Sequence, residues 1–143
     1  TQKIVKALCK IKKNSQKKLY LGNLNAKRDW GHARDYVEAM WKILKHNKPD
    51  DFVISTGKQY SIKDFVNIVC KKLNINILWK GSEKNEKGFW NGKPIVVCDT
   101  KYFRPIDVNT LLGKSTKARK ILKWYPKISL SKMIDDMIKE EIG

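Results

Sequence analysis

Apolar residues recur at helical spacing in five stretches of the chain, and each stretch predicts a helix with one buried face. These stretches cover residues 1–13, 32–45, 61–74, 115–122 and 130–142. Short apolar runs between them predict strands at residues 19–21, 52–54, 75–79 and 95–98. Ser61 and Asp64 have the spacing of a capping box and mark the start of the third helix. Because helices and short strands alternate, the pattern predicts an α/β fold.

The helix predicted at residues 32–45 follows a polar turn and has one apolar side. The residues on this side are Ala33, Tyr36, Val37, Met40, Trp41 and Leu44. We expect this side to pack into the core and to support the polar turn. Asp29 in that turn is available to cap the helix, and Pro49 ends it because proline cannot continue a helix.

Residues 81–92 are polar and contain glycines, which predicts a surface loop. Phe89 and Trp90 are the exceptions in this segment. An aromatic pair there either covers a ligand or folds back on the core, and the core is favoured.

The chain has 143 residues, of which 41% are hydrophobic, and this is enough for one domain with a core over residues 1–143. No apolar run approaches the roughly 18 residues that a membrane span needs, and the first residues lack the apolar region of a signal peptide. We therefore expect a cytoplasmic protein without a membrane partner. The first predicted helix opens at residue 1 without a cap, which suggests that a larger protein is interrupted there.

Cysteines and histidines show no metal-binding or redox pattern. Cys9, Cys70 and Cys98 lie far apart in apolar segments, so we expect buried thiols. His32 and His46 lie fourteen residues apart, without cysteine or acidic partners at the spacing of metal ligands. We expect no metal site, and we interpret His32, at a helix start, as a structural residue.

The formal net charge is +17, which raises nucleic acid or another polyanion as a partner. The chain has 27 lysines but only four arginines, and the lysines are spread along its whole length. Proteins that read nucleic acid usually cluster their charge and use arginine for bidentate contacts. A solvated, lysine-rich surface is therefore favoured, and nucleic-acid binding stays the alternative. The positive field would also attract a diphosphate.

The usual catalytic and cofactor motifs are absent from the sequence. It contains no G-x-G-x-x-G, no Walker loop and no G-x-S-x-G, and no tyrosine is followed by a lysine four residues later. We therefore assign no catalytic and no cofactor-binding residue within the chain.

Two turns are centred on arginine, one on Arg28 and one on Arg104. Arginine presents a planar fork of donors that matches phosphoryl oxygens and keeps its charge at any working pH. These turns could therefore grip a phosphate. In the alternative interpretation, each arginine pairs with its neighbouring aspartate, Asp29 or Asp107, and only pins its own turn.

Three further residues could serve a ligand near these arginines. Lys3 adds a cation, and Gly22 would let a ligand approach the backbone closely. Asn23 could hydrogen-bond a base or a sugar. The alternative for Gly22 and Asn23 is an ordinary turn.

Together these motifs resemble the C-terminal half of the GDP-mannose 4,6-dehydratases, a family of extended short-chain dehydrogenases/reductases. The matching segments are residues 1–4, 19–41, 51–54 with Gly57, 85–88, 102–105 and 112–124, in the order of the family. The run Lys-Arg-Asp-Trp-Gly-His-Ala-x-Asp-Tyr-Val at residues 27–37 is the specific part of this match.

The resemblance implies a two-part enzyme. Its N-terminal Rossmann half binds NADP and carries the catalytic Thr or Ser, the Glu base and the Tyr-x-x-x-Lys pair, and its C-terminal half binds the GDP-sugar. The family reaction moves a hydride from C4 of the mannose to the nicotinamide, removes water across C5 and C6, and returns the hydride to C6. GDP-mannose thereby becomes GDP-4-keto-6-deoxy-mannose, a precursor of GDP-fucose.

The resemblance also implies roles for single residues. Lys3, Arg28 and Arg104 correspond to contacts of the diphosphate and nucleotide. The segment that runs beside the guanosine comprises Leu21, Gly22, Asn23 and Leu24. Asp107 stands where the family has a glutamate, and its carboxylate is one methylene shorter, so its direct contact with the nucleotide is in doubt. Gln2 replaces an arginine of the family pattern, which removes one cation near the site.

The matching segments leave out the whole N-terminal half of the family. We therefore expect a chain that binds GDP-mannose, has no NADP site of its own, cannot dehydrate GDP-mannose unaided, and has its own N-terminal Rossmann half as a partner. Family members form dimers and tetramers mainly through that other half, so a homo-oligomer of this chain is left open.

Overall fold

The computed structural model describes residues 1–103 and 108–142 of the chain. Its α-helices are α1 (Gln2–Lys12), α2 (Ala33–Leu44), α3 (Ile62–Lys72), α4 (Thr116–Ile121) and α5 (Leu130–Ile142). Its strands are β1 (Leu19–Leu21), β2 (Lys27–Arg28), β3 (Tyr60–Ser61), β4 (Leu78–Lys80), β5 (Lys87–Trp90) and β6 (Lys93–Cys98). Two 3₁₀ turns are η1 (Glu83–Asn85) and η2 (Thr100–Tyr102). The mixed α/β fold is as predicted.

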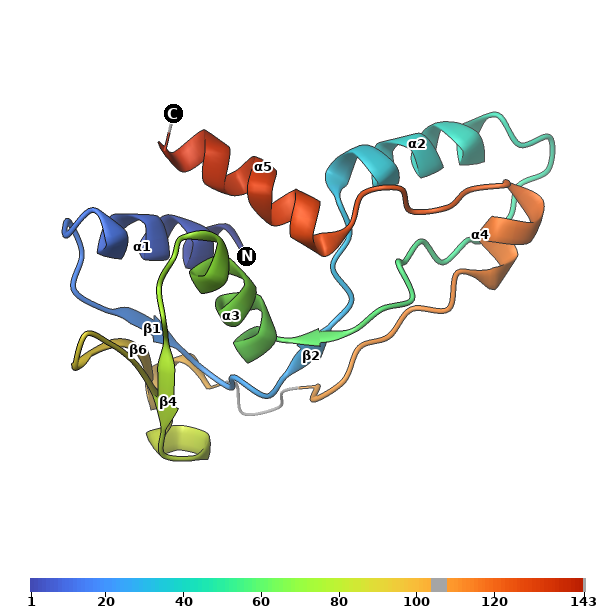
Figure 1. Cartoon of the computed structure of the whole chain (residues 1–143). Helices are drawn as coiled ribbons and strands as arrows, with labels where there is room; N and C mark the ends of the chain where they lie inside the picture. The colour runs from blue at the N-terminus through green and yellow to red at the C-terminus, as the bar shows by residue number, and fades with distance from the viewer. Residues whose placement is uncertain (104–107, 143) are drawn as a thin grey trace.

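Four strands form one sheet in the order β1, β6, β5, β4 (Figure 1). β1 runs parallel to β6, with Leu21 opposite Cys98, and the other neighbours are antiparallel. β2 and β3 form a separate antiparallel pair. Because β1 and β6 are parallel, the chain leaves both strands at the same edge of the sheet, and this brings the segments after Leu21 and after Cys98 together.

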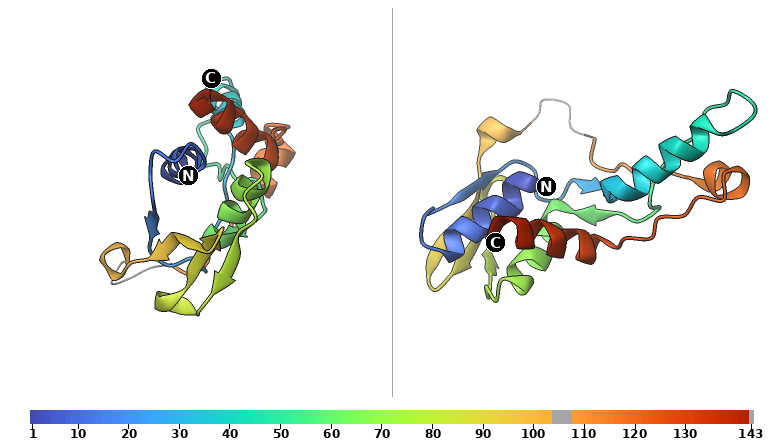
Figure 2. Two further views of the ribbon diagram at one scale, coloured as in Figure 1. Left: turned by 60° about the vertical axis from the view of Figure 1, so that its left-hand side comes forward. Right: turned by 90° about the horizontal axis from the view of Figure 1, so that it is seen from above.

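The main core lies between the sheet and the three helices α1, α3 and α5, which contact one another (Figures 1 and 2). Side chains on the predicted apolar faces fill it, including the fully buried Val5, Leu8, Phe65, Val66 and Ile134. The capping box at the start of α3 is present, because Ser61 Oγ accepts from Asp64 N at 3.0 Å and the Asp64 carboxylate accepts from Ser61 N at 2.9 Å. This core holds β1 and β6 in place.

A second, smaller core lies at the end of the molecule away from the sheet, where α2 and α4 approach each other (Figure 2). Its buried members are Ala39, Ala118, Leu122 and Trp124, with Tyr36, Ile43, Phe52 and Ile54 packed against them. It contains one large fully buried side chain, Trp124. The second core is therefore thinner than the first.

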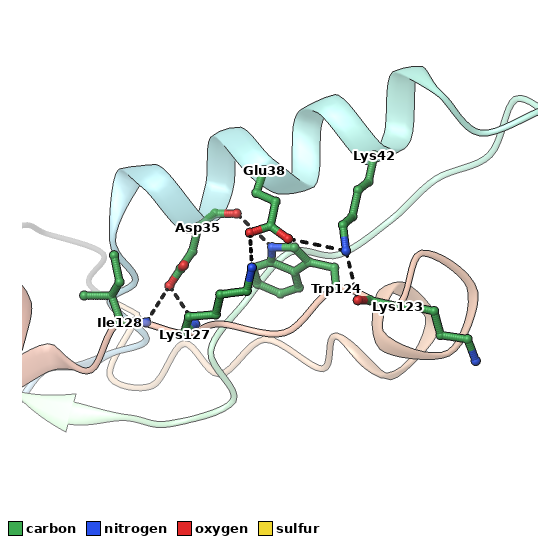
Figure 3. Close-up of polar contacts among 7 residues, drawn as sticks. All are labelled: Asp35, Glu38, Lys42, Lys123, Trp124, Lys127 and Ile128. Atoms are coloured by element: carbon green, nitrogen blue, oxygen red, sulfur yellow. Dashed lines mark hydrogen bonds and ion pairs between the residues drawn. The ribbon is translucent and has the colours of Figure 1, made fainter.

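A polar network joins α2 to the chain between α4 and α5 (Figure 3). Asp35 is only 3% exposed, and its carboxylate accepts from the backbone N–H groups of Lys127 at 3.0 Å and Ile128 at 2.9 Å. The indole of Trp124 donates to the Asp35 carbonyl at 2.8 Å. Glu38 pairs with Lys127 Nζ at 2.7 Å. A buried carboxylate satisfied by backbone donors fixes this crossing of the chain.

The predicted helices are confirmed, each within two residues of its expected bounds. The strands at residues 19–21 and 95–98 are confirmed as β1 and β6. The strand expected at residues 75–79 is shifted to β4, because Ile75 is buried in the main core next to the end of α3.

Two predictions about strands and loops are wrong. Residues 52–54 are apolar because Phe52 and Ile54 pack on the second core, and in the described structure they belong to no strand. Residues 81–92 contain η1 and β5 as well as turns. The β5–β6 hairpin closes through Asn91 and Gly92, with φ of 49° and 75°, the conformation that a two-residue hairpin turn needs. Trp90 packs against the main core, as favoured.

The prediction that the apolar side of α2 packs into the core is confirmed for Tyr36, which packs against the second core, but is wrong for Val37, Met40, Trp41 and Leu44. The exposed fractions are 61% for Val37, 61% for Met40, 56% for Trp41 and 84% for Leu44. Ala39 is fully buried instead, on the side that meets Trp124. The helix cap differs too, since His32 Nδ1 accepts from Arg34 N at 3.1 Å. His32 therefore has the structural role that was expected, and Asp29 is not the cap.

All three cysteines are buried free thiols, as predicted. Burial raises the pKa of the Cys70 thiol to about 12. Burial also raises the pKa of Cys9, with a contribution from Glu141, and that of Cys98, with a contribution from Glu86. The thiolate is the reactive form, so these side chains are held in their inert state.

Candidate functional site

The site is built where the chain leaves β1 and β6. Gly22 follows β1 directly, and its Cα faces the carbonyl of Tyr102 so closely that an added Cβ would lie 2.3 Å from that oxygen. Tyr102 belongs to η2, which follows β6 and begins at the side-chain cap of Asp99. Because Tyr102 O is a backbone atom, only glycine fits at position 22 without moving η2.

Lys3 reaches the same corner from the first turn of α1. Its Nζ donates to the Tyr20 carbonyl at 2.9 Å and lies 4.1 Å from the centroid of the Tyr102 ring. The side chain borders a hollow of about 290 Å³ that also touches Lys6 and Lys10. The sequence-predicted pair of Lys3 and Gly22 is therefore brought together by their common neighbour Tyr102.

Arg28 lies on β2, next to the chain that returns at residue 108. Its Nη1 donates to the Val108 carbonyl at 2.7 Å and to the Lys27 carbonyl at 2.8 Å. The backbone of Lys27 also bonds to that returning chain, to Asn109 O at 2.8 Å and from Leu111 N at 3.2 Å. Arg104 and Asp107 lie outside the described residues, but their neighbours Tyr102 and Val108 contact Gly22 and Arg28.

Asp29 neither caps α2 nor pairs with Arg28, the two roles that the sequence had suggested for it. Its carboxylate accepts from Thr56 N at 3.0 Å, from Thr56 Oγ1 at 2.5 Å and from Gly57 N at 2.9 Å. Gly57 has a φ of 76° at this turn. Asp29 therefore fixes the turn at residues 56–57 beside β2, which holds Arg28 in position through the backbone.

Leu21 and Leu24 anchor the turn after β1 to the main core. Their side chains are 8% and 2% exposed and belong to the main core. Their carbonyls accept from Asp99 N at 2.8 Å and from Lys63 N at 3.0 Å, respectively. These two residues therefore fix the turn between them, and Asn23 lies at the surface of the turn, where its Oδ1 accepts from Asn25 N at 2.9 Å.

A hollow of about 340 Å³ opens beside Asn23. Its lining residues are Asn23, Asn25, Glu83, Lys84, Phe103 and Asn109. From the sequence, Glu83 and Lys84 were expected only as charged residues of a surface loop, and their place in this lining was not predicted. Gly81 and Gly88 bound this charged segment in the sequence and are the available signal, but the atoms that they approach, the Asn85 carbonyl and the Ile77 side chain respectively, appear only in the fold.

The described part of the chain places polar and aromatic side chains at this corner of the fold. It offers cations, amides and an aromatic ring around the turn after β1. Among the residues that the structure describes, no group of three His, Cys, Asp or Glu side chains could hold a metal ion. None of the helices described is both long and apolar enough to traverse a lipid bilayer.

The chain is similar to proteins of known identity. The family model described as GDP-mannose 4,6 dehydratase matches residues 1–137. GDP-mannose 4,6 dehydratase of Dictyostelium discoideum is 46% identical over 144 residues, and the protein of the same name from Homo sapiens is 41% identical over 144 residues. Each match covers 99% of this chain but only 40% and 39% of those relatives. The chain thus spans about two-fifths of their length.

Solved structures share the fold. RMD from Pseudomonas aeruginosa complexed with NADPH matches with a TM-score of 0.76 at 13% identity, over 98% of this chain and 41% of that one. WbmG from Bordetella bronchiseptica in complex with NAD and UDP matches with a TM-score of 0.66 at 19% identity, over 95% of this chain and 38% of that one. At these identities the likeness is one of fold alone.

Proposed function

The chain belongs to the GDP-mannose 4,6-dehydratase family, and from this premise we propose that it forms the C-terminal, GDP-sugar-binding part of such an enzyme. The whole enzyme would be an NADP-dependent lyase that converts GDP-mannose to GDP-4-keto-6-deoxy-mannose and water. The chain spans about two-fifths of its curated relatives, so this activity is proposed for the complete protein.

One observation supports the binding role above all others. Gly22 lies against the Tyr102 carbonyl, two residues before Arg104 in the sequence, and Arg28 on β2 donates to the Val108 carbonyl, one residue after Asp107. Lys3 joins them through the Tyr102 ring. We infer that these cations and this glycine serve one diphosphate site, because arginine and lysine side chains pair with phosphoryl oxygens.

Each residue has a proposed part in holding GDP-mannose. Lys3, Arg28 and Arg104 donate to the diphosphate oxygens. Gly22 lets the nucleotide lie against the backbone, and Asn23 hydrogen-bonds its base or ribose. Leu21 and Leu24 orient this turn through their buried side chains and bonded carbonyls, and Asp107 accepts from the nucleotide.

NADP is the proposed cofactor of the whole enzyme, where it would accept and return the hydride. The described residues do not fit this group, because the turn at Gly22 leads from β1 to β2, whereas a dinucleotide site needs a strand, a glycine turn and a helix in sequence. The residues of this chain would therefore bind and orient the sugar nucleotide. With NADP added, we expect this chain alone to leave GDP-mannose unchanged, and turnover would overturn that expectation.

The exposed apolar side of α2 supports a further part of the proposal, a contact with the enzyme's own N-terminal Rossmann half. Val37, Met40, Trp41 and Leu44 lie at helical spacing on one side, each more than half exposed. Such a continuous apolar side marks an interaction surface. Relatives carry further polypeptide beyond the matched two-fifths, which provides the partner. Self-association through the same side would instead give a homo-oligomer.

Calorimetric titration with GDP tests the binding role. We expect saturable binding that weakens at least tenfold in Arg28→Ala, since a charge-assisted hydrogen bond contributes about 1.5–3 kcal/mol. Arg34→Ala is the matched control, because Arg34 is exposed on α2 and its removal changes the charge equally. Circular dichroism of each variant checks that the fold is intact. Equal GDP affinity in the Arg28 and Arg34 variants would contradict the proposal.

The net charge of +17 supports one alternative, a non-catalytic basic module that binds nucleic acid or another polyanion. Titration with a short DNA duplex at two salt concentrations separates the two functions. The proposed function predicts GDP binding that depends on Arg28. The alternative predicts DNA binding that falls steeply with salt and is indifferent to Arg28→Ala relative to Arg34→Ala.

A further inference from the structure

The loop between β4 and β5 brings an exposed carboxylate and an exposed ammonium to the hollow beside Asn23. Glu83 and Lys84 are both exposed on η1 and line this hollow of about 340 Å³ together with Phe103. Resting on the function proposed above, we propose that Glu83 selects guanine over adenine in the bound nucleotide, with Lys84 and Phe103 completing the base site.

The loop is connected to the turn after β1 through α3. Gly81 has a φ of 82°, and an added Cβ would lie 2.6 Å from Asn85 O, so the turn is closed tightly around η1. Glu86, only 6% exposed, forms an ion pair with Lys63. The backbone N–H of Lys63 donates to Leu24 O at 3.0 Å. η1 is therefore tied through α3 to the same turn that presents Asn23.

Glu83 itself has a backbone conformation that L-residues other than Asn, Asp and Gly rarely adopt, with a φ of 48°. Such conformations persist where the surroundings impose them, and they concentrate at functional sites. Asn85 N donates to Ser82 O at 3.0 Å and Glu86 N to Glu83 O at 3.3 Å, and these bonds close the turn around residue 83. The backbone at Glu83 is thus held in this conformation before a ligand arrives.

Phe103 provides the apolar surface of the site. Its ring is half-buried, packs against the main core, and lies 5.9 Å from Lys84 Nζ, within cation–π range. Bases stack well on aromatic rings, and stacking tolerates any base. Phe103 therefore contributes affinity, and selection must come from the polar groups around it.

The polar groups match the edge of guanine. A carboxylate only accepts hydrogen bonds, and guanine presents two donors side by side, N1–H and the 2-amino group. Guanine O6 is an acceptor that suits the Lys84 ammonium. Adenine presents an unprotonated N1 in the same place, so a carboxylate there meets a lone pair without a proton between them. Glu83 thus favours guanine and disfavours adenine at once.

Titration with GDP, IDP and ADP tests the inference, since IDP lacks the 2-amino group. We expect the parent chain to prefer GDP over ADP, and Glu83→Gln to reduce this preference by roughly tenfold, mainly through weaker GDP binding. The parent chain should also bind GDP more tightly than IDP, and Glu83→Gln should bind both equally. Phe103→Leu should weaken all three nucleotides by a similar factor.

Glu140→Gln is the matched control, because Glu140 is exposed on α5, and it should leave every ratio unchanged. GDP binding with the same GDP-to-ADP ratio in Glu83→Gln and Glu140→Gln overturns the assignment of Glu83 and leaves the proposed function standing. Absence of GDP binding to the folded parent chain overturns both.

Discussion

At the scale of one residue, Gly22 lets the backbone of another segment come close to the turn after β1. Its Cα lies against Tyr102 O, so the absence of a side chain allows η2 to reach the turn after β1. The sequence alone offered two interpretations of this glycine, the close approach of a ligand and an ordinary turn. The tertiary contact supplies the reason, because the oxygen comes from a residue 80 positions away.

Gly22→Ala should therefore lower the free energy of unfolding by about 1–3 kcal/mol, since η2 must move to admit the methyl group, and it should weaken GDP binding. Gly92→Ala serves as the control. It meets nothing within 4 Å, and its φ of 75° costs about 1–2 kcal/mol by itself. Chemical denaturation and GDP titration of both variants measure the two effects. GDP affinity reduced equally in both would argue against a site at Gly22.

Cys70 predicts a pH dependence at the same scale. Burial raises the pKa of its thiol from 9.0 to about 12, so the thiol ionises at lower pH in the unfolded chain than in the folded one. The contribution to stability is complete below pH 9 and is lost as pH rises from about 9 to 12. Cys70→Ala should show a shallower fall of stability over this range than the parent chain. An equal slope in denaturation experiments would refute this.

The side chains of Glu83 and Asp29 were the hardest to interpret from sequence. A charged residue in a polar stretch is ordinarily a solvated surface group, and nothing local distinguished Glu83 from its neighbours. Asp29 precedes a helix, which suggested a cap, but Thr56 and Gly57 lie closer to it in the fold. For Asp29 the deciding partners come from a distant segment.

At the scale of elements, α2 shows that apolar spacing predicts a helix but not which side of it is buried. Spacing correctly predicted a helix with an apolar side. The side that is buried in this chain contains Asp35 and Ala39, whereas Trp41 and Leu44 are exposed. Periodicity reports the composition of a helix side, but it does not report which partner covers it.

We therefore expect the double substitution of Met40→Ser and Trp41→Ser to leave the melting temperature of this chain nearly unchanged and to abolish self-association if the parent chain associates through this side. Ala39→Leu is the contrasting variant, because Ala39 is fully buried beside Trp124, and overpacking there should cost about 1–3 kcal/mol. Thermal melts and sedimentation measure both effects. A large loss of stability in the double variant would show that this side is packed.

At the scale of the whole molecule, two cores of unequal size share one chain. The main core contains most of the large fully buried side chains, whereas the second has Trp124 and small residues. Asp29 and Asp35 tie the two parts together through hydrogen bonds to backbone groups. Local opening is easier where few apolar contacts are broken.

Hydrogen exchange should therefore show weaker protection for amides of α2 and α4 than for those of α1 and α3. Asp35→Asn should lower protection in α2 further, because the carboxylate that accepts from Lys127 and Ile128 is replaced by a weaker acceptor. The main core should keep its exchange rates. Uniform protection across all four helices would mean that the chain opens as one unit.

The sequence by itself determined the helices, two strands, the buried cysteines and the family, because these depend on local spacing, capping and ordered motifs. Only the tertiary structure decided which side of α2 is covered, where Asp29 binds, and that Lys3, Gly22 and Tyr102 meet. The physical reason is that the spacing of apolar residues along the chain determines which side of a helix or strand is apolar, but not which segment covers that side. The parallel pairing of β1 with β6 then fixes which distant segments leave the sheet together at one edge.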